Sequence, residues 1–110
     1  MSTDLLGEFE RLVLLAVLRC DSHAYALPVR REIEEAAERS VSRGALYRTL
    51  ERLATKGLVD YRFEDADETR GGHPRKIFRV TPPGVEALRR SHAVTARLTD
   101  GLESVLEGSS

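Results

Sequence analysis

The chain has 110 residues, 41% hydrophobic and 32% charged, and its 17 basic and 18 acidic side chains give a formal net charge of -1. This length supports one domain with a modest core, and the composition is that of an ordinary globular protein rather than a disordered one. No apolar run reaches the roughly 18 residues of a membrane-spanning helix, and the start of the chain lacks a signal-peptide pattern, so we expect a cytoplasmic protein without a membrane partner.

Two amphipathic helices are predicted in the first forty residues. Apolar residues at helical spacing indicate a helix over residues 7–19, and Leu14, Leu15 and Leu18 widen its apolar side so far that we expect it to be largely enclosed. A polar break at residues 21–23 separates it from a second helix, where Pro28 is tolerated because it falls in the first turn. The outer face of this second helix carries both acidic and basic side chains.

A third helix is predicted to begin after Ser42, a good N-cap residue, and to end at Gly57. Its leucines recur on one side at helical spacing, which indicates a buried stripe. The opposite side is too polar for a core and strongly basic. It carries Gly44, Arg48, Glu51 and Thr55, with Tyr47 and Arg52 at its edges.

After the third helix the apolar period changes from about 3.6 to 2, which indicates strands. Residues 58–64 and 76–81 are predicted to form an antiparallel hairpin, joined by a polar loop over residues 65–74 that contains Gly71 and Gly72. Thr81 can cap a last helix that starts at Pro82 and keeps one apolar side to the end of the chain. Gly101 in this helix allows either a close approach of a partner or a bend.

The apolar side of this last helix has no later segment to cover it. A domain of this size is too small to bury it, so we expect it to pack, together with the first helix, against a second copy of the chain. The predicted dimerisation residues are Leu88, Val94, Leu98, Leu102, Val105 and Leu106.

These elements predict a mostly α fold with a small β-hairpin, a winged helix-turn-helix with a C-terminal dimerisation helix. We place the DNA-binding domain at residues 1–81, the dimerisation helix at 82–107 and a disordered tail at 108–110. The charges are unevenly distributed, because basic residues gather in 42–56 and 70–79 while acids collect elsewhere. One face is therefore suited to a polyanion.

Six segments together form a familiar pattern: Phe9–Ala16, Ala24–Tyr25, Val41–Leu53, Lys56–Val59, Gly71–Gly72 and Arg79–Gly84. They resemble the PadR family of transcriptional regulators over nearly the whole chain. Two positions depart from the family pattern, since Ala26 stands where glycine is frequent and Ile77 where an aromatic residue is usual. The resemblance implies a homodimeric repressor that binds an inverted-repeat operator in double-stranded DNA and is often released by a small-molecule effector.

A recognition helix in the major groove reads base edges from its N-terminal end. Gly44 lets the backbone approach DNA, Arg48 can pair with guanine, and Tyr47 and Arg52 suit phosphates better. The basic hairpin adds backbone or minor-groove contacts, whereas we expect its acidic half, residues 65–68, to point away from DNA. The predicted DNA-binding residues are Ser42, Arg43, Gly44, Tyr47, Arg48, Arg52, Arg70, His73, Arg75 and Lys76.

Other site types find little support in the sequence. The three histidines have no Asp or Cys at ligand spacing, and no nucleophile, base and orienting acid form a set, so we predict no metal, cofactor or catalytic residues. Cys20 is interpreted as a small buried hydrophobe, with a redox sensor as the alternative. The other readings left open are a winged-helix module that binds protein through its acidic second helix or its terminal helix, and a ligand sensor with a cavity at the dimer seam.

Overall fold

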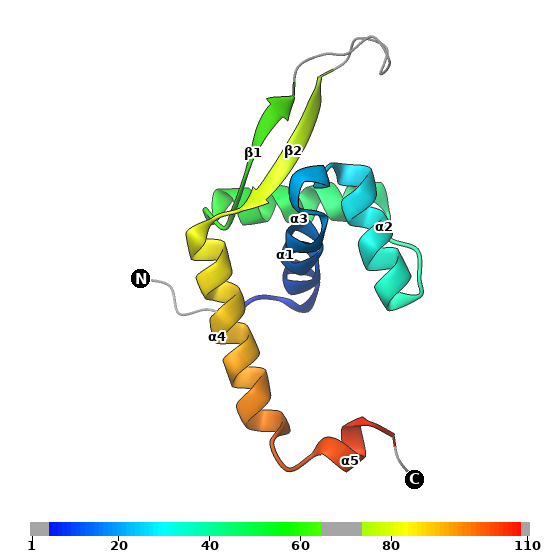
Figure 1. The fold of residues 1–110 in the computed structure, drawn as a ribbon, viewed down its shortest axis with the longest axis vertical. Helices are drawn as coiled ribbons and strands as arrows, with labels where there is room; N and C mark the ends of the chain where they lie inside the picture. The colour runs from blue at the N-terminus through cyan, green and yellow to red at the C-terminus, as the bar shows by residue number, and fades with distance from the viewer. Residues whose placement is uncertain (1–4, 65–73, 109–110) are drawn as a thin grey trace.

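The computed structural model describes residues 5–64 and 74–108, and it has the mostly helical, winged-helix architecture that the sequence predicts. Three helices form the body of the domain, a two-stranded hairpin projects from it, and a long helix leaves it in another direction (Figure 1). No helix in the described ranges is both long and apolar enough to cross a membrane. The elements are α1 (Glu8–Cys20), the 3-10 turn η1 (Asp21–His23), α2 (Ala26–Ala37), α3 (Arg43–Thr55), β1 (Val59–Glu64), β2 (Arg75–Val80), α4 (Pro82–Thr99) and α5 (Glu103–Leu106).

The core lies where α1, α2 and α3 meet the base of the hairpin. Val13 and Leu14 of α1 are fully buried in it, together with the leucine stripe of α3. The expectation that α1 is largely enclosed is wrong for its outer side, because Leu15 and Leu18 are 43% and 45% exposed. The small domain covers only part of the circumference of α1, and these two side chains lie on the uncovered part.

The predicted boundaries of α3 are confirmed. The Ser42 hydroxyl accepts a hydrogen bond from the Ala45 amide at 3.0 Å, which satisfies an amide of the first turn that has no partner within the helix. At the other end Gly57 adopts φ +75, a conformation that few other residues tolerate, and the chain turns into β1.

The hairpin pairs its strands in antiparallel register from Val59 opposite Val80 to Glu64 opposite Arg75. The predicted alternation of buried and exposed side chains is wrong for most of the hairpin, because in β1 only Val59 is buried and in β2 the adjacent Ile77 and Phe78 are both buried. At the base of the hairpin the two valines reach the core. Val59 and Val80 are buried there, whereas Tyr61 and Phe63, on the same face farther out, are 45% and 59% exposed.

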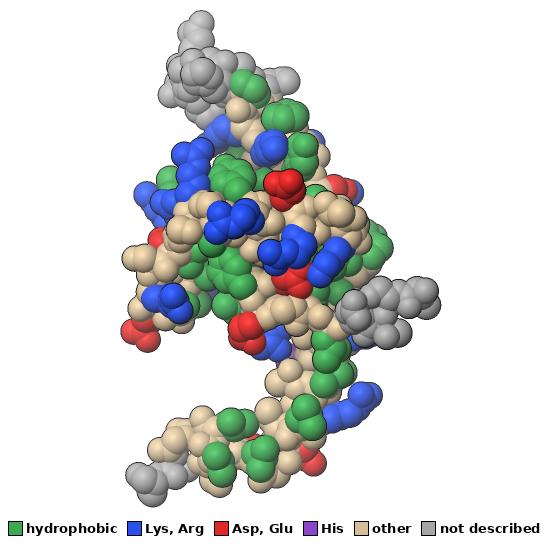
Figure 2. Space-filling model, turned by 180° about the vertical axis from the view of Figure 1, so that it is seen from behind, with side chains coloured by type: hydrophobic (Ala, Val, Ile, Leu, Met, Phe, Trp, Pro, Cys, Tyr) green, Lys and Arg blue, Asp and Glu red, His purple; other side chains and the backbone are tan. Residues whose placement is uncertain are grey.

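The predicted continuous terminal helix is wrong, because α4 ends at Thr99 and the four-residue helix α5 begins only at Glu103. Gly101 between them has φ +85, a conformation that glycine adopts at low cost, and the chain turns aside here before α5 (Figure 1). The two helices form an arm whose exposed hydrophobic side chains are visible in Figure 2.

The six predicted dimerisation residues have different surroundings. Leu88 is only 8% exposed and packs into the core of its own chain, and Val94 is half-buried. The other four lie farther along the arm, from the end of α4 to α5, and are exposed: 71% for Leu98, 46% for Leu102, 73% for Val105 and 62% for Leu106.

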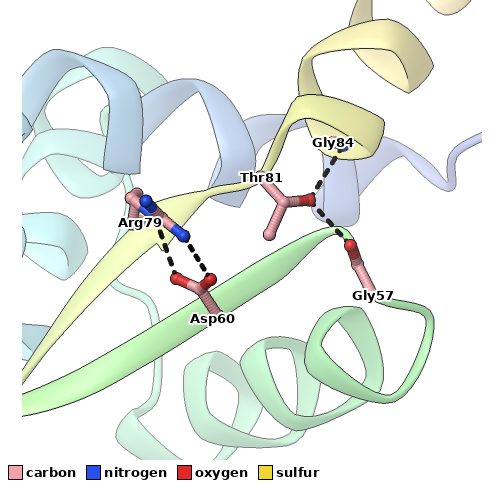
Figure 3. Close-up of polar contacts among 5 residues, drawn as sticks. All are labelled: Gly57, Asp60, Arg79, Thr81 and Gly84. Carbon is pink, nitrogen blue, oxygen red and sulfur yellow. Dashed lines mark hydrogen bonds and ion pairs between the residues drawn. The ribbon is translucent and has the colours of Figure 1, made fainter.

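Thr81 joins the hairpin to α4 at a compact junction (Figure 3). Its hydroxyl donates to the Gly57 carbonyl at 2.7 Å and accepts from the Gly84 amide at 3.1 Å, which confirms the predicted helix cap. Gly84 is required for close approach, since a Cβ there would lie 2.1 Å from the Leu58 carbonyl oxygen. The end of α3 and the start of the arm are thereby fixed to each other.

Candidate nucleic-acid interface

The outer face of α3 presents the predicted reading residues together. Every one of them is exposed, and Tyr47 is 37% exposed at the edge of the face. The Arg43 guanidinium lies 5.5 Å from the centre of the Tyr47 ring, while the Arg48 guanidinium lies over Gly44. These exposed residues are Ser42, Arg43, Gly44, Tyr47, Arg48 and Arg52.

The positive charges of this face are available to a ligand. Among the described residues, no acidic side chain forms an ion pair with Arg43, Arg48 or Arg52. Lys56, at the C-terminal end of α3, is different because its Nζ lies 2.8 Å from the carboxylate of Glu10 in α1. Lys56 therefore holds the end of α3 against α1, and we do not count its charge among those available for a ligand.

Glu10 is a buried carboxylate, only 5% exposed, at the start of α1. Burial raises the pKa of Glu10, but the hydrogen bonds from Lys56 and from the Gly7 amide, at 2.8 Å each, outweigh burial and lower the pKa below its ordinary value. Glu10 is therefore an anion at neutral pH and ties the beginning of α1 to the end of α3.

The two basic residues described at the start of β2 have unequal surroundings. Lys76 Nζ lies 4.4 Å from the centre of the Tyr61 ring and 5.8 Å from that of Phe63, and no acidic side chain in residues 5–64 or 74–108 forms an ion pair with it. Arg75, in contrast, lies 3.3 Å from a carboxylate oxygen of Glu64. Arg70 and His73, also predicted to contact DNA, and the acidic residues 65–68 lie outside the described residues.

A groove connects the hairpin with the first turns of α3. It has a volume of about 1020 Å³ and is bounded by the start of α2, the start of α3 and the outer part of the hairpin. Arg43 and Tyr47 line it from α3, and Arg75 and Lys76 line it from β2. The structure thus brings two predicted groups, separated by about thirty residues in the chain, to one concave surface. Figure 2 shows Lys and Arg side chains, with some acidic ones between them, over the body of the domain above the arm.

Arg30 of α2 lines the same groove and was missed by sequence reasoning. Its Nε is buried and has no hydrogen-bond partner among the described residues. A buried guanidinium nitrogen without a partner is unfavourable, and a phosphate at the groove would supply the missing acceptor. No sequence signal marked Arg30, because a charged residue next to a buried one is ordinary on an amphipathic helix.

Metal and thiol chemistry find no support in the described ranges. No group of three or more His, Cys, Asp or Glu side chains there is arranged to hold a metal ion. Burial and the neighbouring Glu32 raise the pKa of the Cys20 thiol, against a smaller opposing effect of Arg19, and this keeps the thiol protonated at neutral pH. Cys20 is half-buried and packs against the core, and a protonated thiol is a weak nucleophile, which favours the interpretation as a small hydrophobe over a redox sensor.

The helices α2 and α3 form a helix-turn-helix in which α3 is basic, and a basic hairpin follows it. This arrangement defines a winged-helix DNA-binding protein. The family described as transcriptional regulator PadR-like matches residues 14–90, and the chain belongs to this family. It is therefore a PadR-like transcriptional regulator, and DNA-binding regulation is the activity of its family. No protein with a curated description matches the chain.

Solved structures of the same fold come from several bacteria. A PadR-like transcriptional regulator from Bacillus cereus is 19% identical, with TM-score 0.71 and coverage of 92% of this chain and 93% of that chain. A PadR family transcriptional regulator from Eggerthella lenta is 25% identical, with TM-score 0.61 and coverage of 88% and 85%. A PadR-like transcription factor from Bacteroides fragilis is 24% identical, with TM-score 0.69 and coverage of 88% of both chains.

Proposed function

We propose that this regulator binds an inverted-repeat operator as a homodimer, with one α3 in the major groove of each half-site. The observation that carries the proposal is the basic groove that joins α3 to the hairpin. Arg48, exposed in the second turn of α3, reads a base edge, while Arg30, Arg43 and Lys76 bind backbone phosphates. Arg75 lines the same groove, but its ion pair with Glu64 partly neutralises its positive charge.

The arm supports assembly from two copies. Its exposed side chains Leu98 and Val105 are more than two-thirds exposed in the single chain, and α1 offers Leu15 and Leu18 as an apolar surface to receive them. Burial of such side chains against a second copy is favourable at about 25 cal/mol per Å² of apolar area. In this arrangement residues 1–81 bind DNA, residues 82–107 hold the dimer, and the two α3 helices lie about 34 Å apart, one turn of duplex.

Regulation by a small molecule follows from the same arrangement. A groove of about 690 Å³ lies between α1 and α2, with Leu12 and Leu15 in its lining, and this size suits a drug-sized apolar ligand. We propose that the dimer represses transcription and that a ligand at this groove, close to the dimer seam, releases it from DNA. A reporter gene behind the operator should rise in expression when the regulator is deleted and stay unchanged if repression is not its role.

The DNA-binding roles are tested by selection of duplexes from a random library, followed by fluorescence anisotropy at several salt concentrations. Lys76→Ala should weaken binding to the selected duplex and to a random duplex alike, and lower the salt slope by about 0.9 for the lost phosphate contact. Arg48→Ala should remove a preference at one base position worth about 1–3 kcal/mol.

Arg89→Ala is the matched control, because it removes the same charge from an exposed position on α4, where Arg89 pairs only weakly with Glu86 at 3.7 Å. It should leave both affinities close to those of the wild type. If all three variants changed the two affinities by the same factor, the division into base-reading and phosphate-binding residues would be wrong, and if the wild type selected no duplex, so would the proposed function.

A further inference from the structure

Three side chains from three elements meet at the outer end of the hairpin. The Tyr25 hydroxyl, at the residue before α2, donates a hydrogen bond to a carboxylate oxygen of Glu64, the last residue of β1. Arg75, the first residue of β2, lies 3.3 Å from the other carboxylate oxygen and places its guanidinium 3.8 Å from the centre of the Tyr25 ring. We call this group of three residues the wing clamp.

The wing clamp lies where apolar packing of the hairpin has ended. The base of the hairpin is held by the core and by a hydrogen bond from the Phe78 amide to the Ala24 carbonyl at 2.9 Å. Ile77 is the outermost buried apolar side chain described in the hairpin, at 7% exposed, while Phe63 is 59% exposed. Beyond Ile77, the clamp joins the hairpin to the residue that precedes α2.

The clamp is also adjacent to the basic groove. Tyr25 and Arg75 line this groove together with Lys76, which follows Arg75 in β2. The direction in which the outer hairpin projects therefore decides where Lys76 lies relative to Arg43 on α3. A rotation of the hairpin away from α2 would widen the groove and separate the charges on its two sides.

We propose that Glu64 is a positioning residue that fixes the hairpin at the angle at which its basic side chains and α3 contact the same DNA duplex. This inference rests on the proposed function and adds an acidic residue to a surface that binds a polyanion. By simple electrostatics Glu64 would only weaken binding, because it neutralises Arg75 and repels phosphates. The positioning role predicts instead that removal of the Glu64 carboxylate lowers the affinity for DNA. The loss of the hairpin's orientation then weakens binding more than the removal of one negative charge strengthens it.

A matched control exists on the same hairpin. Asp60 and Arg79 form an ion pair with distances of 3.1 and 2.6 Å between guanidinium nitrogens and carboxylate oxygens (Figure 3). This pair lies near the base, where the neighbouring Val59 and Val80 already anchor both strands in the core. Glu64→Gln and Asp60→Asn each remove one negative charge from β1, so they differ in position and not in net charge.

Affinity for the duplex that the wild type selects is measured for both variants, with thermal unfolding as the check on folding. Glu64→Gln should weaken binding about tenfold, the size expected when a charge-assisted hydrogen bond is lost. Asp60→Asn should bind at least as tightly as the wild type. Tyr25→Phe, which leaves every charge and the ring beneath Arg75 in place, should also weaken binding, and the double variant of Tyr25 and Glu64 should weaken it little further.

Amide hydrogen exchange without DNA provides an independent readout. Exchange near Glu64 and Arg75 should accelerate in Glu64→Gln and Tyr25→Phe but not in Asp60→Asn. If Glu64→Gln bound DNA as tightly as Asp60→Asn, Glu64 would act only as a screening charge and the proposal would be overturned. If the wild type bound no duplex, the proposed function would fail, while unchanged exchange in the two clamp variants would separately disprove the clamp.

Discussion

Replacement of Gly44 by alanine separates fold stability from DNA binding. Gly44 is the second residue of α3 and is exposed, so a methyl group there meets no core atom. The Cβ would lie 3.0 Å from Nη1 of Arg48 and 3.8 Å from its Cζ, and these are the ends of a flexible side chain that can move aside. The structure therefore accommodates the substitution with a small displacement of the Arg48 guanidinium.

The two expected effects have opposite signs. Alanine is more favourable than glycine in a helix interior by about 0.8–1 kcal/mol, and for this first-turn position we expect a gain of about 0.5–1 kcal/mol in the free energy of unfolding. DNA affinity should fall, because the methyl group holds the backbone away from the duplex and displaces Arg48 from its base. The loss of a bidentate base contact is worth about 1–3 kcal/mol, so the affinity for the selected duplex should fall about tenfold or more.

Urea denaturation measures the first effect and fluorescence anisotropy with the selected duplex measures the second. Gly7→Ala is the matched control, since Gly7 precedes α1 at φ -66 and its Cβ would make only an ordinary contact, 3.4 Å from the Glu10 carboxylate. This control should leave DNA affinity unchanged. A Gly44→Ala protein that is more stable and still binds the duplex as tightly as the wild type would refute the close approach of α3 to DNA.

Three further substitutions test other parts of the structure. Glu10→Gln should lower the free energy of unfolding at pH 7 by about 1–3 kcal/mol. Because the pKa of Glu10 is lowered in the fold, this difference should shrink as the pH falls below about 4. Urea titrations at pH 7 and pH 3 measure both values. Gly84→Ala should destabilise the protein by about 1–3 kcal/mol or more, measured by thermal unfolding, because its Cβ would collide with the Leu58 carbonyl. Leu98→Glu should shift the protein to monomer in analytical ultracentrifugation and weaken binding to the inverted repeat, and a variant that remains dimeric would exclude the arm as the interface.

The sequence predicts best those features that depend on a few neighbouring residues. The caps at Ser42 and Thr81 were predictable because a hydroxyl reaches an amide three residues ahead in any helix that starts there. Spacing alone also indicated which side of α3 is buried and which face is basic. Such local signals defined the fold and placed the predicted DNA-binding residues of α3 on one exposed face.

Features that need a distant partner were not predictable in the same way. Lys56 looked like part of a basic face until the fold placed it beside Glu10, 46 residues earlier in the chain. Arg30 gained a role only because α3 and the hairpin close a groove around it. Gly101 indicated a bend as one of two options, but the apolar spacing continues across it and does not report a positive φ, so the end of α4 at Thr99 was not predicted.

The Thr81 junction has a consequence for how the regulator can respond to a signal. Thr81 bonds the turn that follows α3 to the first turn of α4, and we expect this junction to couple a tilt of the arm to the orientation of α3. The 18 residues of α4 extend about 27 Å, and a tilt of about 5° at its start displaces its far end by about 2 Å. In the proposed dimer, a slight change in the packing of the two arms would therefore alter the separation of the two α3 helices, and a duplex with a fixed helical repeat would tolerate little such change.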